Sequence, residues 1–230
     1  MSLVEIIVLN KEDAIMAEAN GADRLELVSA IGEGGLTPSY GIIKTVVNSV
    51  DIPVMVMVRP HSYSFTYLKN EWSAMKDDIK MIKELGAAGI VFGALTEHGT
   101  LDFEFLSMVL EECKGLSVTF HRAIDETNPL GLYQSLIGSS FHVDRILTSG
   151  GNPTAIEGIS TLKEMIQQSK QSAHYPIIMP GSGLSLDNIE FVHKELRASE
   201  YHFGSAVRMG GSFQNQIEGN KIKQLKELLT

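Results

Sequence analysis

The sequence has a single cysteine, Cys113, among 230 residues, so no disulfide can form within the chain. A lone cysteine fits a reducing compartment, and we expect a cytoplasmic location. The chain also lacks the short-spaced cysteine and histidine pairs that mark common metal sites. These absences exclude a small disulfide-stabilised domain and leave burial of hydrophobic residues, which make up 43% of the chain, as the main source of stability.

Basic residues are too few and too dispersed to form a nucleic-acid-binding surface. The chain has 19 lysine and arginine residues against 28 aspartate and glutamate residues, for a formal net charge of −9. Nucleic acids and anionic membranes normally need a basic patch, so we expect neither as a partner. The sequence has no apolar run of about 18 residues and no basic segment before a long apolar one at its start. We therefore predict no membrane span and no signal peptide.

The chain does contain eight short, apolar, β-branched runs that alternate with segments of helical spacing. The predicted strands are Val4–Leu9, Arg24–Val28, Val54–Val58, Gly89–Phe92, Leu116–His121, Asp144–Thr148, Ile177–Met179 and Tyr201–Phe203. The predicted helices cover 11–20, 39–49, 71–85, 102–113, 130–138, 154–168, 186–196 and 215–229. This alternation favours parallel strands joined by right-handed crossovers. It predicts one (β/α)8 TIM-type barrel domain over residues 1–230.

In such barrels the functional site lies on the loops that follow the strands. The two longest irregular segments, near 29–38 and 60–70, both follow predicted strands, and the first is glycine-rich enough to act as a lid over the opening. Three helix starts carry an N-cap residue followed by proline at the first helical position. They are Thr37-Pro38, Asn128-Pro129 and Asn152-Pro153.

Alternation along the strands also predicts which side chains point into the barrel. Leu25 and Leu27 suit the outer layer, so Glu26 between them points inward. The same alternation directs a further set inward: Arg24, Val28, Met55, Met57, Arg59, Thr119, His121 and His202. A buried charge is costly unless it is paired. Two interpretations of Glu26 therefore stay open: a core ion pair with Arg24 or Arg59, and a functional carboxylate.

Two of these residues are suited to moving protons. His121 ends the fifth predicted strand at the functional end of the barrel, and histidine titrates near neutral pH. We predict His121 as general acid or base, Glu26 as a second proton-transfer or orienting group, and Arg59 as a clamp for an anionic substrate. His202 fits a core role and a site role equally well. For Asp125 we favour a helix cap over the alternative of orienting His121.

Glycine-rich loops follow the last three predicted strands. Backbone N–H groups of such loops can approach an oxyanion closely, and TIM-type barrels often bind phosphate after strands seven and eight. The predicted anion-binding residues are Arg122, Thr148, Ser149, Gly181, Ser182, Gly183, His202, Gly204 and Ser205. The alternative is a purely structural role, because short turns favour glycine whether or not they bind a ligand. Together with the inward polar residues, these loops indicate an enzyme that performs proton transfer or isomerisation on a small anionic metabolite. A phosphorylated metabolite is one form of this hypothesis.

Several motifs resemble the CutC copper homeostasis family. They are Gly21-Ala-Asp-Arg-Leu-Glu-Leu27, Glu33-Gly-Gly-Leu-Thr-Pro-Ser39, Val58-Arg-Pro60, Val91-Phe-Gly93, Val118-Thr-Phe-His-Arg-Ala123 and Arg145-Ile-Leu-Thr-Ser-Gly150. The resemblance covers roughly residues 20–205. It implies a cytoplasmic TIM-type barrel that binds or handles copper and forms a homo-oligomer such as a dimer.

One position departs from the family pattern. After Leu27, where family members often carry cysteine, this chain has Val28. A thiolate is the natural ligand for copper(I), so its loss leaves the metal ligands unassigned. Methionine thioethers also suit copper(I), but inward methionines such as Met55 and Met57 are more often core residues. Copper handling, implied by the resemblance, is therefore the first hypothesis, and acid/base catalysis, indicated by the inward polar residues, is the alternative. A non-catalytic scaffold is the third.

Overall fold

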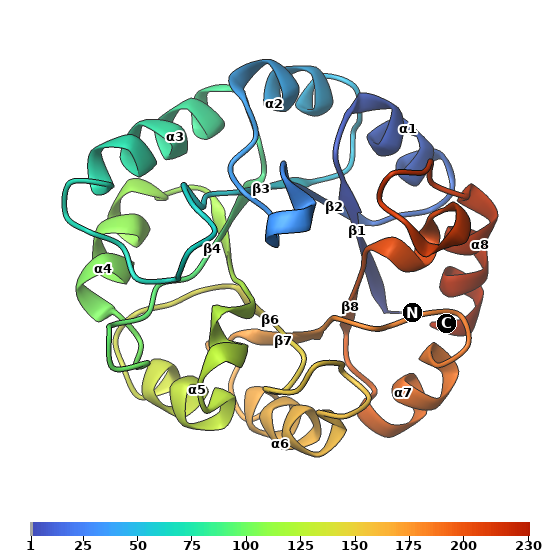
Figure 1. The fold of residues 1–230 in the computed structure, drawn as a ribbon. Helices are drawn as coiled ribbons and strands as arrows, with labels where there is room; N and C mark the ends of the chain where they lie inside the picture. Colours follow the sequence, from blue (N-terminus) through green and yellow to red (C-terminus); the bar gives the residue numbers. More distant parts are fainter. Residues whose placement is uncertain (1) are drawn as a thin grey trace.

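The computed structural model describes residues 2–230 and confirms the (β/α)8 barrel, with a ring of helices around the strands (Figure 1). The strands are β1 (Leu3–Val8), β2 (Arg24–Leu27), β3 (Val54–Met57), β4 (Gly89–Phe92), β5 (Ser117–Phe120), β6 (Arg145–Thr148), β7 (Ile177–Pro180) and β8 (Glu200–Phe203). The helices are α1 (Lys11–Ala19), α2 (Tyr40–Val47), α3 (Trp72–Glu84), α4 (Phe103–Glu112), α5 (Pro129–Ile137), α6 (Ile159–Ser169), α7 (Ile189–Leu196) and α8 (Gly219–Leu228). Short 3-10 turns lie in the loops after β2, β5 and β8: η1 (Ile31–Glu33), η2 (Arg122–Glu126), η3 (Ser205–Val207) and η4 (Met209–Gly211).

The strands are parallel and hydrogen-bonded in the order β7-β6-β5-β4-β3-β2-β1-β8. β7 and β8, at the two ends of this order, lie side by side and nearly close the ring. The register places Glu5 of β1 beside Arg24 of β2 and His202 of β8. Polar side chains from three strands therefore meet inside the barrel. Within residues 2–230, no helix has the length and apolar character to cross a membrane.

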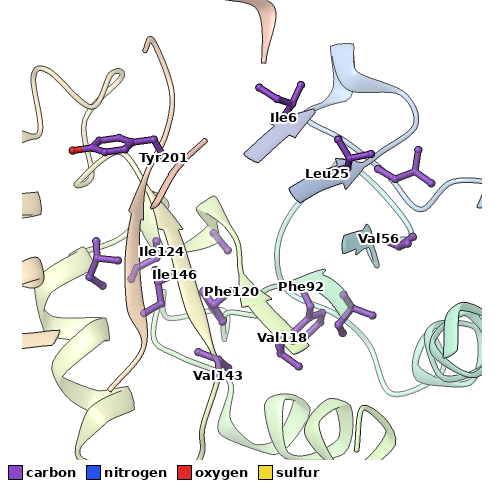
Figure 2. Packing of buried hydrophobic residues seen from close by; sticks show 14 of the residues in the cluster. Ile6, Leu25, Val56, Phe92, Val118, Phe120, Ile124, Val143, Ile146 and Tyr201 are labelled. Atoms are coloured by element: carbon purple, nitrogen blue, oxygen red, sulfur yellow. The ribbon is translucent and has the colours of Figure 1, made fainter. Parts of the chain in front are cut away.

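Burial confirms the predicted alternation of side chains. Leu25, Val56 and Phe120 face outward and belong to the large apolar layer between the strands and the helices (Figure 2). A second, smaller apolar cluster fills part of the interior: Val28, Met55, Met57 and Val91. A Cβ added at Gly89 would lie 2.5 Å from Cε of Met55, so Met55 fills space that only a glycine leaves free. Met55 is therefore a packing residue.

The floor of the barrel interior holds a buried ionic network. Arg24 forms ion pairs with Glu5 and Glu200, and Arg145 Nε lies 3.2 Å from the Glu200 carboxylate. Burial alone would raise the pKa of Glu5, but Arg24 and His202 outweigh it and lower that pKa to about 2. Each charge in this low-dielectric layer therefore depends on its partners.

The core ion pair considered for Glu26 is not formed. Arg24 is engaged by Glu5 and Glu200, and within residues 2–230 Glu26 forms an ion pair with neither Arg24 nor Arg59. Its ionic contact is with His202 instead. Of the two interpretations, the buried arginine pair is therefore wrong.

One of the three predicted helix starts is correct. Asn128 caps α5 and Pro129 takes its first turn. The start at Thr37-Pro38 is wrong, because Ser39 is the N-cap of α2 and its Oγ accepts from the Ile42 N–H. The start near residue 154 is also wrong, since α6 begins only at Ile159. Segment 152–158 first packs on the loop after β6, so closely that a Cβ at Gly158 would lie 1.8 Å from the Ser149 carbonyl oxygen.

We expect Arg24→Met to reduce the free energy of unfolding by about 3 kcal/mol, because it leaves two buried carboxylates without their shared cation. Urea unfolding followed by circular dichroism measures the change. Lys69→Met is the matched control, because Lys69 forms a solvent-exposed ion pair with Glu104. The control should leave the unfolding midpoint unchanged. Equal midpoints for Arg24→Met and the native chain would show that the network contributes nothing to stability.

Candidate functional site

A cavity of about 850 Å³ opens at the carboxyl ends of the strands, where a TIM-type barrel places its chemistry. The three residues predicted to be catalytic, Glu26, Arg59 and His121, all line it. His202 lines it too. In Figure 1, which looks along the barrel axis, the η1 turn lies over the opening. Residues from separate parts of the chain therefore meet in one concave site.

Glu26 belongs to a buried chain of carboxylates and imidazole. Its Oε2 lies 3.3 Å from Nε2 of His202, and His202 Nδ1 lies 2.9 Å from Oε1 of Glu5. Burial raises the pKa of Glu26 to about 7, the negative charge of Glu5 adds to this, and His202 opposes it. For His202, burial would lower the pKa, but Glu26 and Glu5 outweigh it and raise that pKa above its usual value. Near neutral pH, Glu26 is therefore able both to accept and to release a proton.

Glu5 is a site residue that the prediction from sequence did not include. A signal for it was present, because Val4, Ile6 and Val8 alternate with it and are fully buried. By the rule applied to Glu26, those three residues pack outward and Glu5 points into the barrel.

His121 is held as a neutral imidazole. Its Nδ1 accepts a hydrogen bond from the Ala123 N–H at 3.2 Å, so the ring proton resides on Nε2. Burial lowers the pKa of His121 to about 3, and the nearby positive charge of Arg59 adds to the effect. Within the described residues Nε2 is buried and has no hydrogen-bond partner. The arrangement favours a hydrogen-bond donor to a ligand over the general acid or base predicted from sequence.

Two contacts fix the His121 ring in place. A Cβ added at Gly93 would lie 2.5 Å from Nδ1, so the ring packs directly on the backbone of Gly93. Phe65 meets the ring edge-on with centroids 4.9 Å apart. The donor is therefore preorganised by its surroundings.

Arg59 binds the loops around the opening. Its guanidinium donates to the carbonyl oxygens of Glu33 at 3.0 Å, Gly35 at 3.3 Å and Ser62 at 3.3 Å. It also lies 4.5 Å from the ring centroid of Phe65. Both terminal nitrogens donate to backbone oxygens, whereas within the described residues the buried Nε has no hydrogen-bond partner, so the predicted contact with an anion stays a prediction. Arg59 joins segments 29–38 and 60–70 and adds positive charge beside His121.

The loops after β7 and β8 contribute to the cavity wall. Ser182, Gly183, Gly204 and Ser205, all predicted to bind an anion, line the cavity. Within residues 2–230, the N–H groups of Ser182, Gly183, Ser205 and Ala206 donate no hydrogen bond. Backbone donors of this kind can bind an oxyanion.

Three other predicted anion-binding residues do not line the cavity. The Gly181 N–H donates to the Thr148 carbonyl oxygen at 3.0 Å. The Thr148 hydroxyl donates to Asp125 at 2.5 Å, and the Ser149 hydroxyl donates to the Asn152 carbonyl oxygen at 2.5 Å. Their polar groups are used within the protein, so the predicted contacts with a ligand are not supported at these positions.

Asp125 is neither a helix cap nor a partner of His121. The cap of α5 is Asn128. Asp125 instead accepts from the backbone of the loop after β6, with Ser149 N at 3.0 Å and Gly151 N at 3.0 Å. It also lies 2.9 Å from Arg122 Nε. Arg122 lines the cavity, but this ion pair partly neutralises it. The preference for a cap is therefore wrong: Asp125 ties two neighbouring loops together.

No obvious metal centre is formed by the usual ligands. Within residues 2–230, no group of three or more histidine, cysteine, aspartate and glutamate side chains is arranged to hold a metal ion. Cys113 is buried at the end of α4, where burial raises the pKa of its thiol to about 12. Val28, at the position where the family pattern often has cysteine, lines the cavity and provides no ligand.

Comparison with known proteins places this geometry in a family. The model of the CutC family matches residues 2–207. The chain belongs to the CutC family. A human protein named copper homeostasis protein cutC homolog is 42% identical over 99% of this chain and 87% of its own length. A family protein CutC from Histophilus somni (strain 2336) is 36% identical over 98% of each chain.

Solved structures support the CutC assignment and the fold. The crystal structure of the putative copper homeostasis protein CutC from Streptococcus agalactiae has a TM-score of 0.79 and 29% identity, over 89% of this chain and 98% of that one. A phosphoribosyl anthranilate isomerase from Thermococcus kodakaraensis has a TM-score of 0.64 and 15% identity, over 100% of this chain and 99% of that one. The second likeness shows the barrel fold alone.

We expect His121 of this CutC chain to remain a neutral Nε2–H imidazole from about pH 5 to about pH 9, because burial and Arg59 disfavour its charged form. Long-range ¹H–¹⁵N NMR of the histidine rings measures both tautomer and charge. The His121→Gln variant identifies the signal by its loss, and the urea-unfolded chain gives the reference titration near pH 6.5. A His121 signal that gains charge within this range would contradict the assigned state.

Proposed function

We propose that this CutC family member is an enzyme that binds a small phosphorylated anion in the barrel mouth and transfers a proton on it. One observation carries the proposal: residues of the loops after β7 and β8 whose backbone N–H groups are unused line the same cavity as Glu26 and His121. The N–H groups supply an anion site, and the two side chains supply a proton acceptor and a hydrogen-bond donor.

Two arginines at the cavity suit an anionic ligand. The chain as a whole is acidic, with a formal net charge of −9. Yet Arg59 is buried beside His121, and Arg122 reaches the cavity from the loop after β5. Guanidinium groups pair well with phosphate or carboxylate, and these two arginines stand beside the carboxylates of Glu33, Glu97 and Glu126 in the cavity lining.

Glu26 is the group suited to move the proton. Its pKa near 7 keeps a useful fraction of the carboxylate ionised at neutral pH while leaving it basic enough to accept a proton. Glu5 holds His202 from the other side, so the contact between His202 and Glu26 keeps the carboxylate in position. His202 and Glu5 are positioning residues in this scheme.

We expect inorganic phosphate at millimolar concentration to raise the melting temperature of the protein by about 2–4 °C, because a ligand that binds only the folded state stabilises it. Ser205→Asp should abolish this increase, since its carboxylate would repel the anion at the proposed site. Differential scanning fluorimetry measures both.

The matched control for the phosphate test is Ser212→Asp, which adds the same charge on the same loop at a residue that does not line the cavity. It should retain the response. Phosphate and simple sugar phosphates that leave the melting temperature of the native chain unchanged would remove the main support for an anion site.

Direct copper handling is the second candidate, favoured by the names of the relatives. The cavity lining includes the thioether of Met57 and the imidazoles of His121 and His202, of which His202 is already held between Glu5 and Glu26. Binding at His121 would have to displace the Nε2 proton and place a cation near Arg59. We also infer a cytoplasmic location and a homo-oligomeric state. Both inferences rest on the sequence and on the family.

Competition against bicinchoninate tests the copper proposal. If copper is cargo of the cavity, the protein should take up about one copper(I) ion per chain from the chelator, and Met57→Leu should weaken this uptake at least about tenfold. Met209→Leu is the control, because Met209 is half exposed and lies outside the cavity. Copper that stays entirely with the chelator would reject direct handling.

A further inference from the structure

The proton acceptor and the hydrogen-bond donor of the cavity come from separate parts of the barrel wall. Glu26 lies on β2, and His202, which contacts it, lies on β8; both strands pair with β1. His121 directly follows β5, which is four strands from β1 in the eight-strand order and therefore lies across the ring from it. A small molecule bound between them would meet a carboxylate on one side and an imidazole N–H on the other.

The Glu26 carboxylate and the His121 imidazole suit two parts of the same reaction. The Glu26 carboxylate has no arginine partner within residues 2–230, so no guanidinium ties up its basic oxygens. His121 presents an N–H whose direction is fixed by the Ala123 hydrogen bond and by packing on Gly93. A carboxylate base and a neutral imidazole donor together suit removal of a proton from carbon next to a carbonyl, since negative charge then develops on the carbonyl oxygen.

The anion site lies on further loops of the same cavity. Gly183 and Ser205, with unused N–H groups, come after β7 and β8 and line the cavity together with Glu26 and His121. A phosphate held there would leave the rest of a short carbon chain free to extend between the carboxylate and the imidazole. The volume of about 850 Å³ accommodates a sugar phosphate.

We propose that the substrate is an enolisable α-hydroxy ketone or α-hydroxy aldehyde that carries a phosphate, and that the protein interconverts the two by a 1,2-proton shift. This inference rests on the proposed function and names its substrate class. Glu26 and His121 are the catalytic residues, and the loops after β7 and β8 hold the phosphate.

The reaction is balanced without any co-reactant. The Glu26 carboxylate takes the proton from the carbon that bears the hydroxyl group, and the electrons of the broken C–H bond form the new C=C bond. The carbonyl π pair moves onto its oxygen, where the His121 Nε2–H stabilises the charge. The hydroxyl proton then moves to that oxygen. Finally, the Glu26 carboxylic acid returns its proton to the neighbouring carbon, and the second oxygen becomes the carbonyl.

Deuterium exchange tests the proposal. The native protein is incubated in D₂O with dihydroxyacetone phosphate, ribulose 5-phosphate or fructose 6-phosphate, and loss of the C–H signal next to the carbonyl is followed by ¹H NMR. We expect protein-dependent exchange with at least one of them. Glu26→Gln should slow it by about 10³-fold and His121→Gln by about 10²-fold, in the range for loss of a general base and of one oxyanion donor.

Controls separate chemistry from binding and folding. Glycerol 3-phosphate carries the phosphate but no carbonyl, so it should raise the melting temperature without exchanging. Glu84→Gln removes the same charge from an exposed position on α3, outside the cavity lining, and should exchange at the native rate. Glu26→Asp keeps a carboxylate but shortens its reach, so it should exchange faster than Glu26→Gln and more slowly than the native protein. Thermal unfolding of each variant verifies its fold.

The outcomes distinguish this inference from the proposed function. If sugar phosphates raise the melting temperature but show no deuterium exchange, the inference of an enolisable substrate is wrong and the anion site is still supported. Exchange that persists in Glu26→Gln would overturn the assigned base. Neither stabilisation nor exchange with any probe would overturn both the substrate class and the proposed function.

Discussion

The Glu5 carboxylate is the constraint on which the interior of this barrel depends. It is fully buried, and it binds Arg24 in the floor and His202 in the site. A lone carboxylate in this position would be strongly destabilising, so Arg24, His202 and their own partners are needed together. Stability of the floor and electrostatics of the cavity therefore depend on the same carboxylate.

The contrast between Glu5 and Glu26 shows how one barrel gives two carboxylates opposite properties. Both are buried, and burial alone raises the pKa of each. Glu5 has Arg24 and His202, which reverse the effect, whereas Glu26 has His202 and the repulsion of Glu5. The first is thereby kept ionised as a structural group, and the second is left near neutrality, where a proton-transfer group is most useful.

Several charged side chains around the opening bond neighbouring loops to one another. Arg59 links the segments after β2 and β3, and Asp125 links those after β5 and β6. These contacts consume arginine and carboxylate groups that the sequence alone suggests for substrate. Among residues 2–230, the deeply buried polar groups that line the cavity without an arginine or backbone partner are Glu26 with its histidine and the His121 Nε2–H, and the residues with unused backbone N–H groups lie on the loops after β7 and β8. This set of groups carries our proposal of chemistry on an organic anion in this CutC family member.

The sequence by itself determined the barrel, its outer apolar layer and the inward direction of Glu26, Arg59, His121 and His202. Each of these follows from local periodicity, since alternation in a strand decides a face without reference to the rest of the chain. The resemblance to the CutC family was likewise visible in short motifs.

Only the tertiary structure decided which partners those side chains have. Glu26 contacts His202 rather than an arginine because β1 pairs with both β2 and β8, and that register is a property of the closed ring. The proton position on His121 depends on the turn that brings the Ala123 N–H to Nδ1. Charge state and hydrogen-bond capacity inside a protein are set by neighbours in space, and these come from segments up to about 200 residues apart in the sequence.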